Sequence, residues 1–120
     1  MPGKTYQDFV REAKTRIREV TAEETMRLVR EQPGTVLVDC REPNEFALGH
    51  IPGAVFIPRG VLEQNIERAV PRDRSVILYC ASGNRSALAA DVLQQMGYTD
   101  VASLAGGIRA WVDAGGDIEG

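Results

Sequence analysis

The stretch SVILYCASGNRSALAADVLQQMG, residues 75–97, decides the fold class of this protein. Its first six residues form an apolar run with β-branched and aromatic side chains, which is typical of a buried strand. Residues 85–97 place apolar side chains at helical spacing and finish at Gly97, a residue that suits the end of a helix. Between them lies a short loop of small and polar residues. The stretch therefore predicts a strand that passes through a tight loop into a helix.

The same alternation continues on both sides of this stretch. Further strands are predicted at 35–40, 54–58 and 100–106, and helices at 6–18, from 21 to the residue before Pro33, around 45–48, at 60–70 and at 107–116. Thr21 and Glu24 have the spacing of a capping box at the start of the second helix. Strands that alternate with helices imply a parallel sheet covered by helices on both faces. Ligands of such sheets bind beyond the carboxyl ends of the strands, where Cys80 lies.

The composition is that of one globular domain. The chain has 120 residues, of which 43% are hydrophobic and 26% charged, and this length is enough to bury a hydrophobic core. A net charge of −3 gives no reason to expect nucleic acid or an anionic membrane as a partner. We see no apolar run of the kind that a signal peptide or a membrane-spanning helix requires, so we expect a soluble, cytoplasmic protein.

The cysteines do not indicate a metal site. Cys40, Cys80 and the single histidine lie far apart in the sequence, whereas metal ligands usually occur in closely spaced pairs. In a cytoplasmic protein we expect both thiols to be reduced.

The loop after the strand favours negative charge on the sulfur of Cys80. Nucleophilic sulfur chemistry needs a thiolate, whereas an ordinary cysteine, with a pKa of about 8.5, is mostly a neutral thiol at neutral pH. The unpaired N–H groups in the first turn of the following helix stabilise an anion at this place. Gly83 permits positive φ and Arg85 adds a permanent charge. We predict an anion cradle that keeps the sulfur charged and reachable, made of the Arg85 side chain and the backbone N–H groups of Ala81, Ser82, Gly83, Asn84, Arg85 and Ser86.

The alternative is that Cys80 is only a buried residue at the end of a strand, followed by an ordinary turn. A lone cysteine after an apolar strand is usually of that kind. Here the small residues of the loop, its glycine and its arginine all favour an anion, and residues 80–90 contain no acidic side chain. We therefore favour a chemical role for Cys80.

Three segments of the chain resemble the single-domain rhodaneses, a family of sulfurtransferases. They are LVDCREPNEFALGHIPGAVFIP (37–58), VILYCASGNRSALAADVLQQMGY (76–98) and LAGGIRAWVDAGG (104–116). The family's opening pattern of aspartate, arginine, glutamate and GHIPGA is met by Asp39, Arg41, Glu45 and residues 49–54. Its catalytic cysteine falls on Cys80, and its six-residue active loop falls on 80–85.

The resemblance implies a fold, a set of boundaries and an activity. The fold is α/β, with a central, mostly parallel, five-stranded sheet and helices on both faces. Residues 1–18 are then an N-terminal helical extension, 19–116 the rhodanese-like domain and 117–120 a short tail. The implied activity is thiosulfate sulfurtransferase. A small anionic sulfur donor loads a persulfide on Cys80, and cyanide, a thiol or a protein takes the sulfur. Neither a metal nor an organic cofactor is implied.

Four residues outside the loop have an expected place near it. The resemblance implies that Asp39 and Arg41 form a buried polar pair that braces the Cys80 loop. Arg59 either points into the pocket mouth, where it attracts an anionic donor, or is an ordinary surface arginine. Cys40 is expected to pack as a small hydrophobic residue, with a disulfide to Cys80 as the alternative.

Two other functions remain open. One is a sulfur-relay or interaction module without turnover, which exchanges sulfur only with a partner protein. The other is a cysteine-based phosphatase. Phosphatases that share this fold place five residues between the cysteine and the arginine of their loop. Only four residues separate Cys80 from Arg85, and the shorter loop suits a single sulfur better than a phosphate group.

Overall fold

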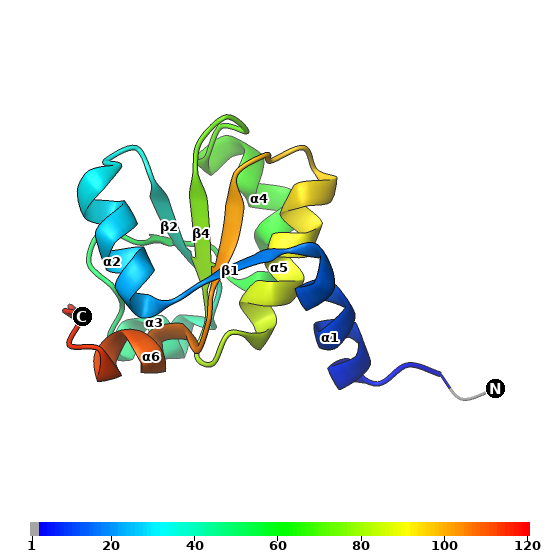
Figure 1. The fold of residues 1–120 in the computed structure, drawn as a ribbon, viewed down its shortest axis with the longest axis horizontal. Helices are drawn as coiled ribbons and strands as arrows, with labels where there is room; N and C mark the ends of the chain where they lie inside the picture. The colour runs from blue at the N-terminus through cyan, green and yellow to red at the C-terminus, as the bar shows by residue number, and fades with distance from the viewer. Residues whose placement is uncertain (1–2) are drawn as a thin grey trace.

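The computed structural model describes residues 3–120, and Figure 1 shows its ribbon. These residues contain a five-stranded parallel sheet in the order β1-β5-β4-β2-β3. The strands are β1 (Arg18–Val20), β2 (Val36–Asp39), β3 (Val55–Phe56), β4 (Val76–Tyr79) and β5 (Val101–Leu104). The helices are α1 (Tyr6–Arg16), α2 (Ala22–Glu31), α3 (Pro43–Leu48), α4 (Leu62–Ala69), α5 (Asn84–Gln95) and α6 (Gly107–Asp113), with a 3-10 turn, η1 (Arg59–Val61), before α4. The predicted α/β fold class is confirmed.

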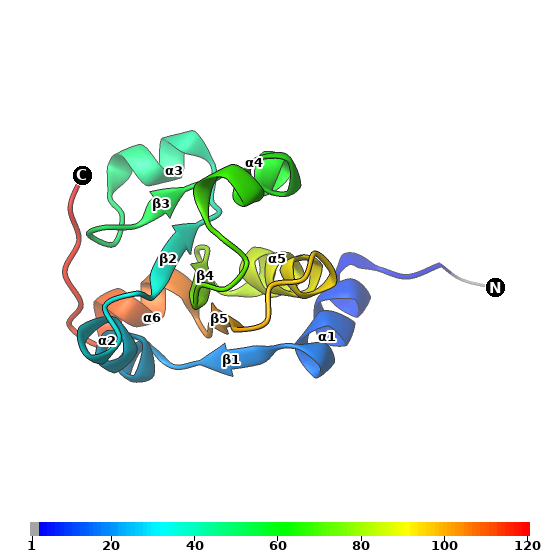
Figure 2. The ribbon, with the colours of Figure 1, turned by 90° about the horizontal axis from the view of Figure 1, so that it is seen from above.

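Helices cover both faces of the sheet. Figure 2 shows α1, α4 and α5 on one side and α2 and α6 on the other. Side chains of β4 alternate between these sides, as the pleat of a strand requires: Leu78 and Cys80 lie in the core with α4 and α5, while Ile77 and Tyr79 lie in the core with α2 and α6. Strand β4 is central and all four of its residues are buried, which explains its continuous apolar sequence.

The predicted elements are found with shorter bounds, and one strand was missed. The first helix ends at Arg16 and not at residue 18, because residues 18–20 form the edge strand β1 beside β5. Two of its three residues, Arg18 and Glu19, are charged and exposed, so no apolar pattern marks the strand. The strand expected at 54–58 pairs only at Val55–Phe56.

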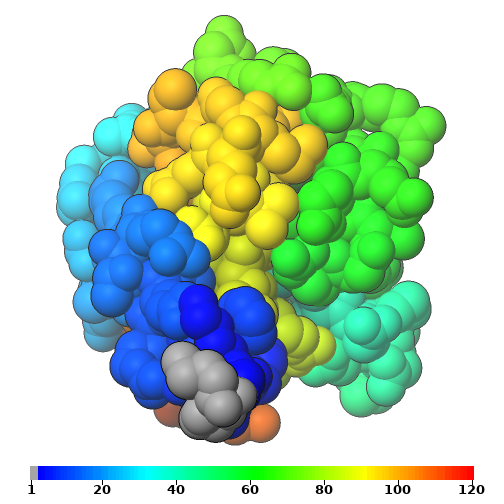
Figure 3. Space-filling model, turned by 90° about the vertical axis from the view of Figure 1, so that its right-hand side faces the viewer, coloured from blue at the N-terminus to red at the C-terminus, as the bar shows by residue number. Residues whose placement is uncertain are grey.

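Helix α1 packs along α5, and Figure 3 shows the two side by side with α4. Val10 and Ala13 of α1 are buried, and Arg16 donates two hydrogen bonds to Asp91 of α5, at 3.0 and 2.8 Å. The division into an extension at 1–18 and a domain at 19–116 stays a prediction. No helix within residues 3–120 has the length and apolar character needed to cross a membrane.

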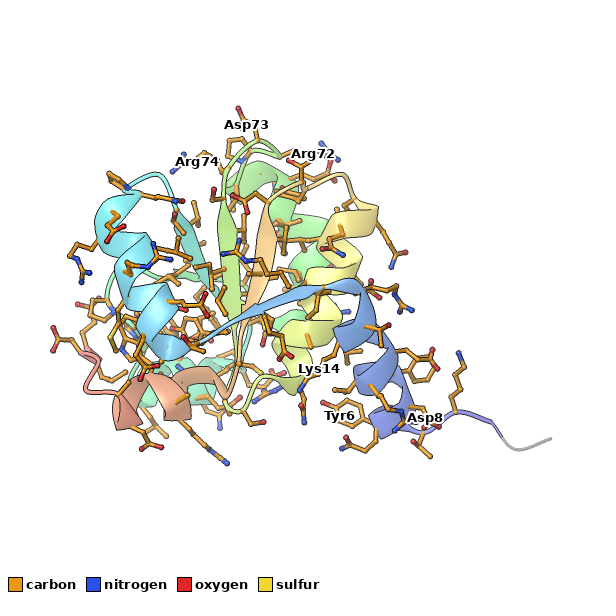
Figure 4. All side chains as sticks on the ribbon, viewed as in Figure 1. Tyr6, Asp8, Lys14, Arg72, Asp73 and Arg74 are labelled. Carbon is orange, nitrogen blue, oxygen red and sulfur yellow. The ribbon has the colours of Figure 1, made fainter. Side chains whose placement is uncertain are left out.

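The carboxyl ends of the strands gather at the end of the molecule where α3 and α6 lie (Figure 1). The opposite end carries the turn before β4, with Arg72, Asp73 and Arg74 labelled in Figure 4. Cys80 directly follows β4, so the fold places it at the α3 and α6 end.

The capping box of α2 generates a stability prediction. The hydroxyl of Thr21 accepts from the Glu24 N–H at 3.0 Å, and the Glu24 carboxylate accepts from the Thr21 N–H at 3.1 Å. Thr21→Ala should lower the free energy of unfolding by about 1 kcal/mol because one helix N–H loses its acceptor. Urea unfolding measures the loss. Thr15→Ala, at an exposed helical position, is the control and should change stability by less than about 0.5 kcal/mol. Equal losses in both variants would contradict the capping argument.

Candidate active site

The sulfur of Cys80 lies inside the turn that joins β4 to α5. Its Sγ accepts hydrogen bonds from the backbone N–H of Gly83 at 3.1 Å and of Ser86 at 3.4 Å. Gly83 has φ of +98°, the left-handed region that glycine adopts without strain, and this conformation turns the chain back over the sulfur. The structure therefore brings two amides of the predicted anion cradle to the sulfur, whereas the catalytic role of Cys80 stays a prediction.

The other predicted cradle residues contribute differently. Ala81 and Asn84 are half-buried and Ser82 is exposed. Within residues 3–120, no hydrogen bond joins their N–H groups to the sulfur. The Ser86 hydroxyl lies 3.5 Å from the Cys80 sulfur and 2.8 Å from the hydroxyl of Ser103 on β5. Sequence analysis missed Ser103, because nothing in its own stretch marks it as different from a core strand residue.

The first turn of α6 holds the first two peptides of the loop. The N–H of Ile108 donates to the carbonyl of Cys80 at 2.9 Å, and the N–H of Arg109 donates to the carbonyl of Ala81 at 3.4 Å. Gly107 has φ of +61°, and a Cβ there would overlap both of these carbonyls. The segment 104–116 thus contributes two backbone N–H donors to the loop, and Gly107 allows the close approach because it has no side chain. The apolar pattern of the segment did not predict this role.

The sulfur is not open to solvent, which corrects the prediction of a reachable thiol. Cys80 is only 1% exposed in this conformation. The reason is its position in the alternation of β4: the side chain points into the core on the α4 and α5 side, where Val38, Leu62 and Ala89 also lie. The first turn of α5 supplies the Ser86 amide from the same side.

Arg85 is paired with a carboxylate that sequence analysis had not connected with it. Its guanidinium donates two hydrogen bonds to Glu45 of α3, at 2.8 and 3.0 Å. The N–H of Glu42 also donates to Glu45, at 2.9 Å. The hydrogen bond from Arg85 lowers the pKa of Glu45 to about 2, and the same bond raises the pKa of Arg85. The predicted free cation above the sulfur is therefore compensated by a fixed anion. The sequence signal for this ion pair was Glu45 in the opening pattern, but its partner, Arg85, lies 40 residues away along the chain.

Asp39 and Arg41 form the predicted buried pair, but they brace a different part of the structure. Arg41 donates to Asp39 at distances down to 2.7 Å and to the carbonyl of Gly49 at 2.7 Å. Its guanidinium carbon lies 5.8 Å from the ring of Tyr79. No hydrogen bond within residues 3–120 joins Arg41 to the loop 81–86. Through this contact the pair adjoins Tyr79, the residue before Cys80.

Arg59 and Cys40 lie together beside the site. The Arg59 side chain pairs with Glu63 at 2.9 Å, and its N–H donates to the carbonyl of Cys40 at 3.1 Å. Cys40 is fully buried and its thiol donates to the Tyr79 carbonyl at 3.3 Å. Burial strongly raises the pKa of Cys40, so this thiol is neutral. Both cysteines are reduced, and no group of three or more potential metal ligands occurs within residues 3–120.

Fold and site together define a class: a parallel α/β domain with a single cysteine held by backbone amides at the carboxyl end of its central strand. The sequence pattern of the rhodanese-like domain family matches residues 21–114. The chain belongs to this family.

Relatives agree with this membership. A protein of Allochromatium vinosum named sulfurtransferase is 37% identical over 99 residues, which cover 82% of this chain and 92% of the relative. The thiosulfate sulfurtransferase GlpE of Pseudomonas fluorescens is 39% identical, covering 73% of this chain and 79% of the relative. A solved structure from Rhodopseudomonas palustris, described as a protein of unknown function and possible tyrosine phosphatase, superposes with a TM-score of 0.88 at 37% identity, covering 99% of both chains.

The glycine contact generates the first site prediction. Gly107→Ala should lower the free energy of unfolding by about 2 kcal/mol or more, because its methyl group overlaps two backbone carbonyls of the Cys80 loop. Thermal or urea unfolding measures this. Gly115→Ala is the matched control: its φ is +89°, but nothing lies within 4 Å of the added Cβ, so it loses only about 1 kcal/mol. A Gly107→Ala variant as stable as Gly115→Ala would show that the close contact is unimportant.

The Glu45 pair generates a prediction on pH. The folded pKa of Glu45, about 2, lies below its ordinary value of 4.5, so the ionised form stabilises the folded state. The stability of the wild type relative to Glu45→Gln should be constant above pH 5 or so, and should shrink as the pH falls toward about 2. Urea titrations at several pH values measure this difference in stability. Glu67→Gln is the control, because it also removes one carboxylate that is paired with an arginine. A difference that grows on acidification would contradict the pairing.

Proposed function

We propose that this chain is a sulfurtransferase that moves a sulfane sulfur from a donor such as thiosulfate to a thiophilic acceptor through a persulfide on Cys80. The observation that carries the proposal is the pair of N–H groups, from Gly83 and Ser86, that meet at one sulfur. Donors aimed at one atom favour negative charge on that atom, and the persulfide anion formed there needs the same environment. The relatives named sulfurtransferase support the general chemistry.

In the loading step the Cys80 thiolate attacks the outer sulfur of thiosulfate. A bond forms between this sulfur and the Cys80 Sγ, while the sulfur–sulfur bond of thiosulfate breaks and its electron pair leaves with sulfite. The total charge is unchanged, because a thiolate and a dianion become a persulfide anion and a dianion. No base is required once the thiol is ionised. The Ser86 hydroxyl lies between Cys80 and Ser103, so it can donate a hydrogen bond to the sulfur when the sulfur is negatively charged.

In the discharge step the acceptor attacks the outer sulfur of the persulfide. With cyanide, a carbon–sulfur bond forms, the sulfur–sulfur bond breaks, and thiocyanate leaves while the Cys80 thiolate is regenerated. With a thiolate acceptor the product is a new persulfide. Because both half-reactions pass through the same covalent intermediate, we expect ping-pong kinetics.

Access to the sulfur requires a local movement. Cys80 is 1% exposed, so a donor reaches its sulfur only when neighbouring side chains shift. The strands on both sides of β4 are fixed by the sheet, whereas Ser82 of the loop is exposed. We propose that the loop side opens to admit the donor.

A cysteine phosphatase is the second candidate, because the Rhodopseudomonas palustris neighbour is described as a possible tyrosine phosphatase. Two features argue against it here. Only four residues separate Cys80 from Arg85. The Arg85 guanidinium donates two hydrogen bonds to Glu45 and is therefore not free to bind a phosphate group. Hydrolysis of an aryl phosphate without any thiosulfate turnover would favour the phosphatase over our proposal.

Mass spectrometry of the intact protein tests the proposal. After treatment with thiosulfate and removal of excess donor, we expect the wild type to gain the mass of one sulfur atom, and cyanide to remove it with release of thiocyanate. Cys80→Ser should gain nothing, because no thiolate is left in the anion cradle. Cys40→Ser is the matched control and should still load. Equal loading of Cys80→Ser and the wild type would overturn the assignment of Cys80.

A further inference from the structure

A buried pair of hydroxyl groups lies beside the Cys80 sulfur. Ser86 and Ser103 are both fully buried, and their Oγ atoms are 2.8 Å apart. The Ser86 Oγ is also 3.5 Å from the Cys80 Sγ. Three groups that can each carry a proton therefore form one row, which runs from Cys80 through Ser86 to Ser103. A buried hydroxyl proton without an acceptor is costly, so the directions of the hydrogen bonds in this row affect its stability.

The pairing of β5 with β4 fixes the position of Ser103. Side chains of β5 alternate between the faces of the sheet, so Ser103 points to the same side as Val101, which packs in the core with α4 and α5. Ser103 pairs with Leu78 of β4, and Leu78 lies in that core together with Cys80. A serine in such an apolar place needs a hydrogen-bond partner.

The number of donors and acceptors in the row gives its direction. Within residues 3–120, the one hydrogen-bond partner of the Ser103 hydroxyl is Ser86. If Ser86 donated to Ser103, the Ser103 proton would be buried without an acceptor. If Ser103 donates to Ser86, the Ser86 proton is free to point at the Cys80 sulfur, and both hydroxyl protons have an acceptor. The second direction is therefore favoured.

This direction also suits an ionised sulfur. The two links of the row are filled by the two hydroxyl protons, so a thiolate of Cys80 accepts from the Ser86 hydroxyl as well as from the N–H groups of Gly83 and Ser86. A neutral thiol brings a third proton, for which the row has no free acceptor. A persulfide anion on Cys80 brings no such proton. The row thus favours the two anionic forms that sulfur transfer requires.

We propose that Ser103 is a positioning residue for sulfur transfer: its hydroxyl donates to Ser86, and this bond directs the Ser86 proton to the Cys80 sulfur. As a role in sulfur transfer, this inference rests on the proposed function. Ser103 acts on the reaction only through Ser86. The hydrogen bond from Ser86 stabilises the thiolate that attacks the donor, and the thiolate that forms again when the acceptor takes the sulfur.

The charged groups near the sulfur remain as they are when Ser103 is changed, because none of them is hydrogen-bonded to it. Three ion pairs belong to this set: Arg85 of α5 with Glu45 of α3, Arg59 of η1 with Glu63 of α4, and Arg41 with Asp39 of β2. Cys40 is neutral because burial raises its pKa, and Arg109 of α6 is exposed. A change in the ionisation of Cys80 in a Ser103 variant therefore reports the lost hydroxyl.

The pH dependence of Cys80 loading tests the proposal. The measured quantity is the second-order rate constant for loading by thiosulfate in a single turnover, followed by the release of sulfite. This rate constant rises with pH as the thiol ionises. In Ser103→Ala the midpoint of the rise should move up by about one pH unit, so that loading is roughly ten-fold slower below the midpoint and recovers above it. A rate lowered by the same factor at every pH would overturn the inference, because that is the result of a merely structural defect.

Two further variants are matched to Ser103→Ala. Ser103→Thr keeps the hydroxyl and should have the midpoint of the wild type. Thr25→Val removes another fully buried hydroxyl, which donates to the Thr21 carbonyl at 2.8 Å on α2, at the other face of the sheet. It should leave the midpoint unchanged even though it lowers stability. A folded Ser103→Thr with the midpoint of Ser103→Ala would contradict the role of the hydroxyl.

Ser86→Ala shows whether Ser103 acts through Ser86. This variant alone should raise the midpoint at least as much as Ser103→Ala does, because the sulfur loses the hydroxyl that donates to it. Adding Ser103→Ala to Ser86→Ala should cause no further shift of the midpoint. Shifts that add in the double variant would mean that the two hydroxyls act independently, and the inference would then be wrong.

Two measurements separate this inference from the proposed function and from a failure to fold. If thiosulfate loads the wild type at no pH, the proposed function fails. Alkylation of Cys80 by iodoacetamide, located by peptide mass, still reports its ionisation, and an unshifted alkylation profile in Ser103→Ala would refute the role of Ser103. If Ser103→Ala does not fold, NMR of the wild type gives the direction of the row. The Ser86 hydroxyl proton should lie against the β-protons of Cys80, and a position against those of Ser103 would overturn the inference.

Discussion

Two backbone N–H groups that point at one sulfur atom are the interaction on which the rest of this structure depends. The Gly83 and Ser86 amides reach Cys80 only because the chain reverses directly after β4, and that reversal needs a glycine with positive φ. On the other side of the loop, α6 can approach closely because Gly107 has no side chain. The sheet contributes by fixing where β4 ends, so that a turn of few residues comes to surround a single atom.

Charge around this turn is organised by pairing rather than by accumulation. Asp39 and Arg41 are buried together, which satisfies two ions that would each be costly alone, and they tie the turn at Gly49 to Tyr79. Glu45 plays the corresponding part at the surface, where it compensates Arg85. Within residues 3–120, the N–H groups of Gly83 and Ser86 are the backbone dipoles that point at the Cys80 sulfur. Such dipoles are set by the fold and do not vary with the rotamer of a long side chain.

Much of the fold follows from periodicity alone. The strand at 75–80 and the helix at 85–97 were predicted from their apolar patterns, and the capping box at Thr21 is found at the predicted position. Strands whose formation depends on pairing with a neighbouring strand were predicted less well. Strand β1 consists of three residues and exposes two charged side chains, so it exists because β5 offers an edge, not because its own sequence favours a strand. The pairing of β3 with β2 is limited to Val55 and Phe56.

The amino-acid sequence by itself determined the local features on which the proposed site rests: an apolar strand, a cysteine at its end, and a small-residue loop with Gly83 before a helix, all within a dozen residues. Only the tertiary structure decided what surrounds that cysteine. Glu45 lies 40 residues from Arg85 and Ser103 lies 17 from Ser86, and neither contact follows from local pattern because each depends on how separate elements pack. The burial of the Cys80 sulfur has the same origin. Local sequence sets the backbone conformation of a loop, whereas the partners of its side chains are set by the packing of segments that are distant along the chain.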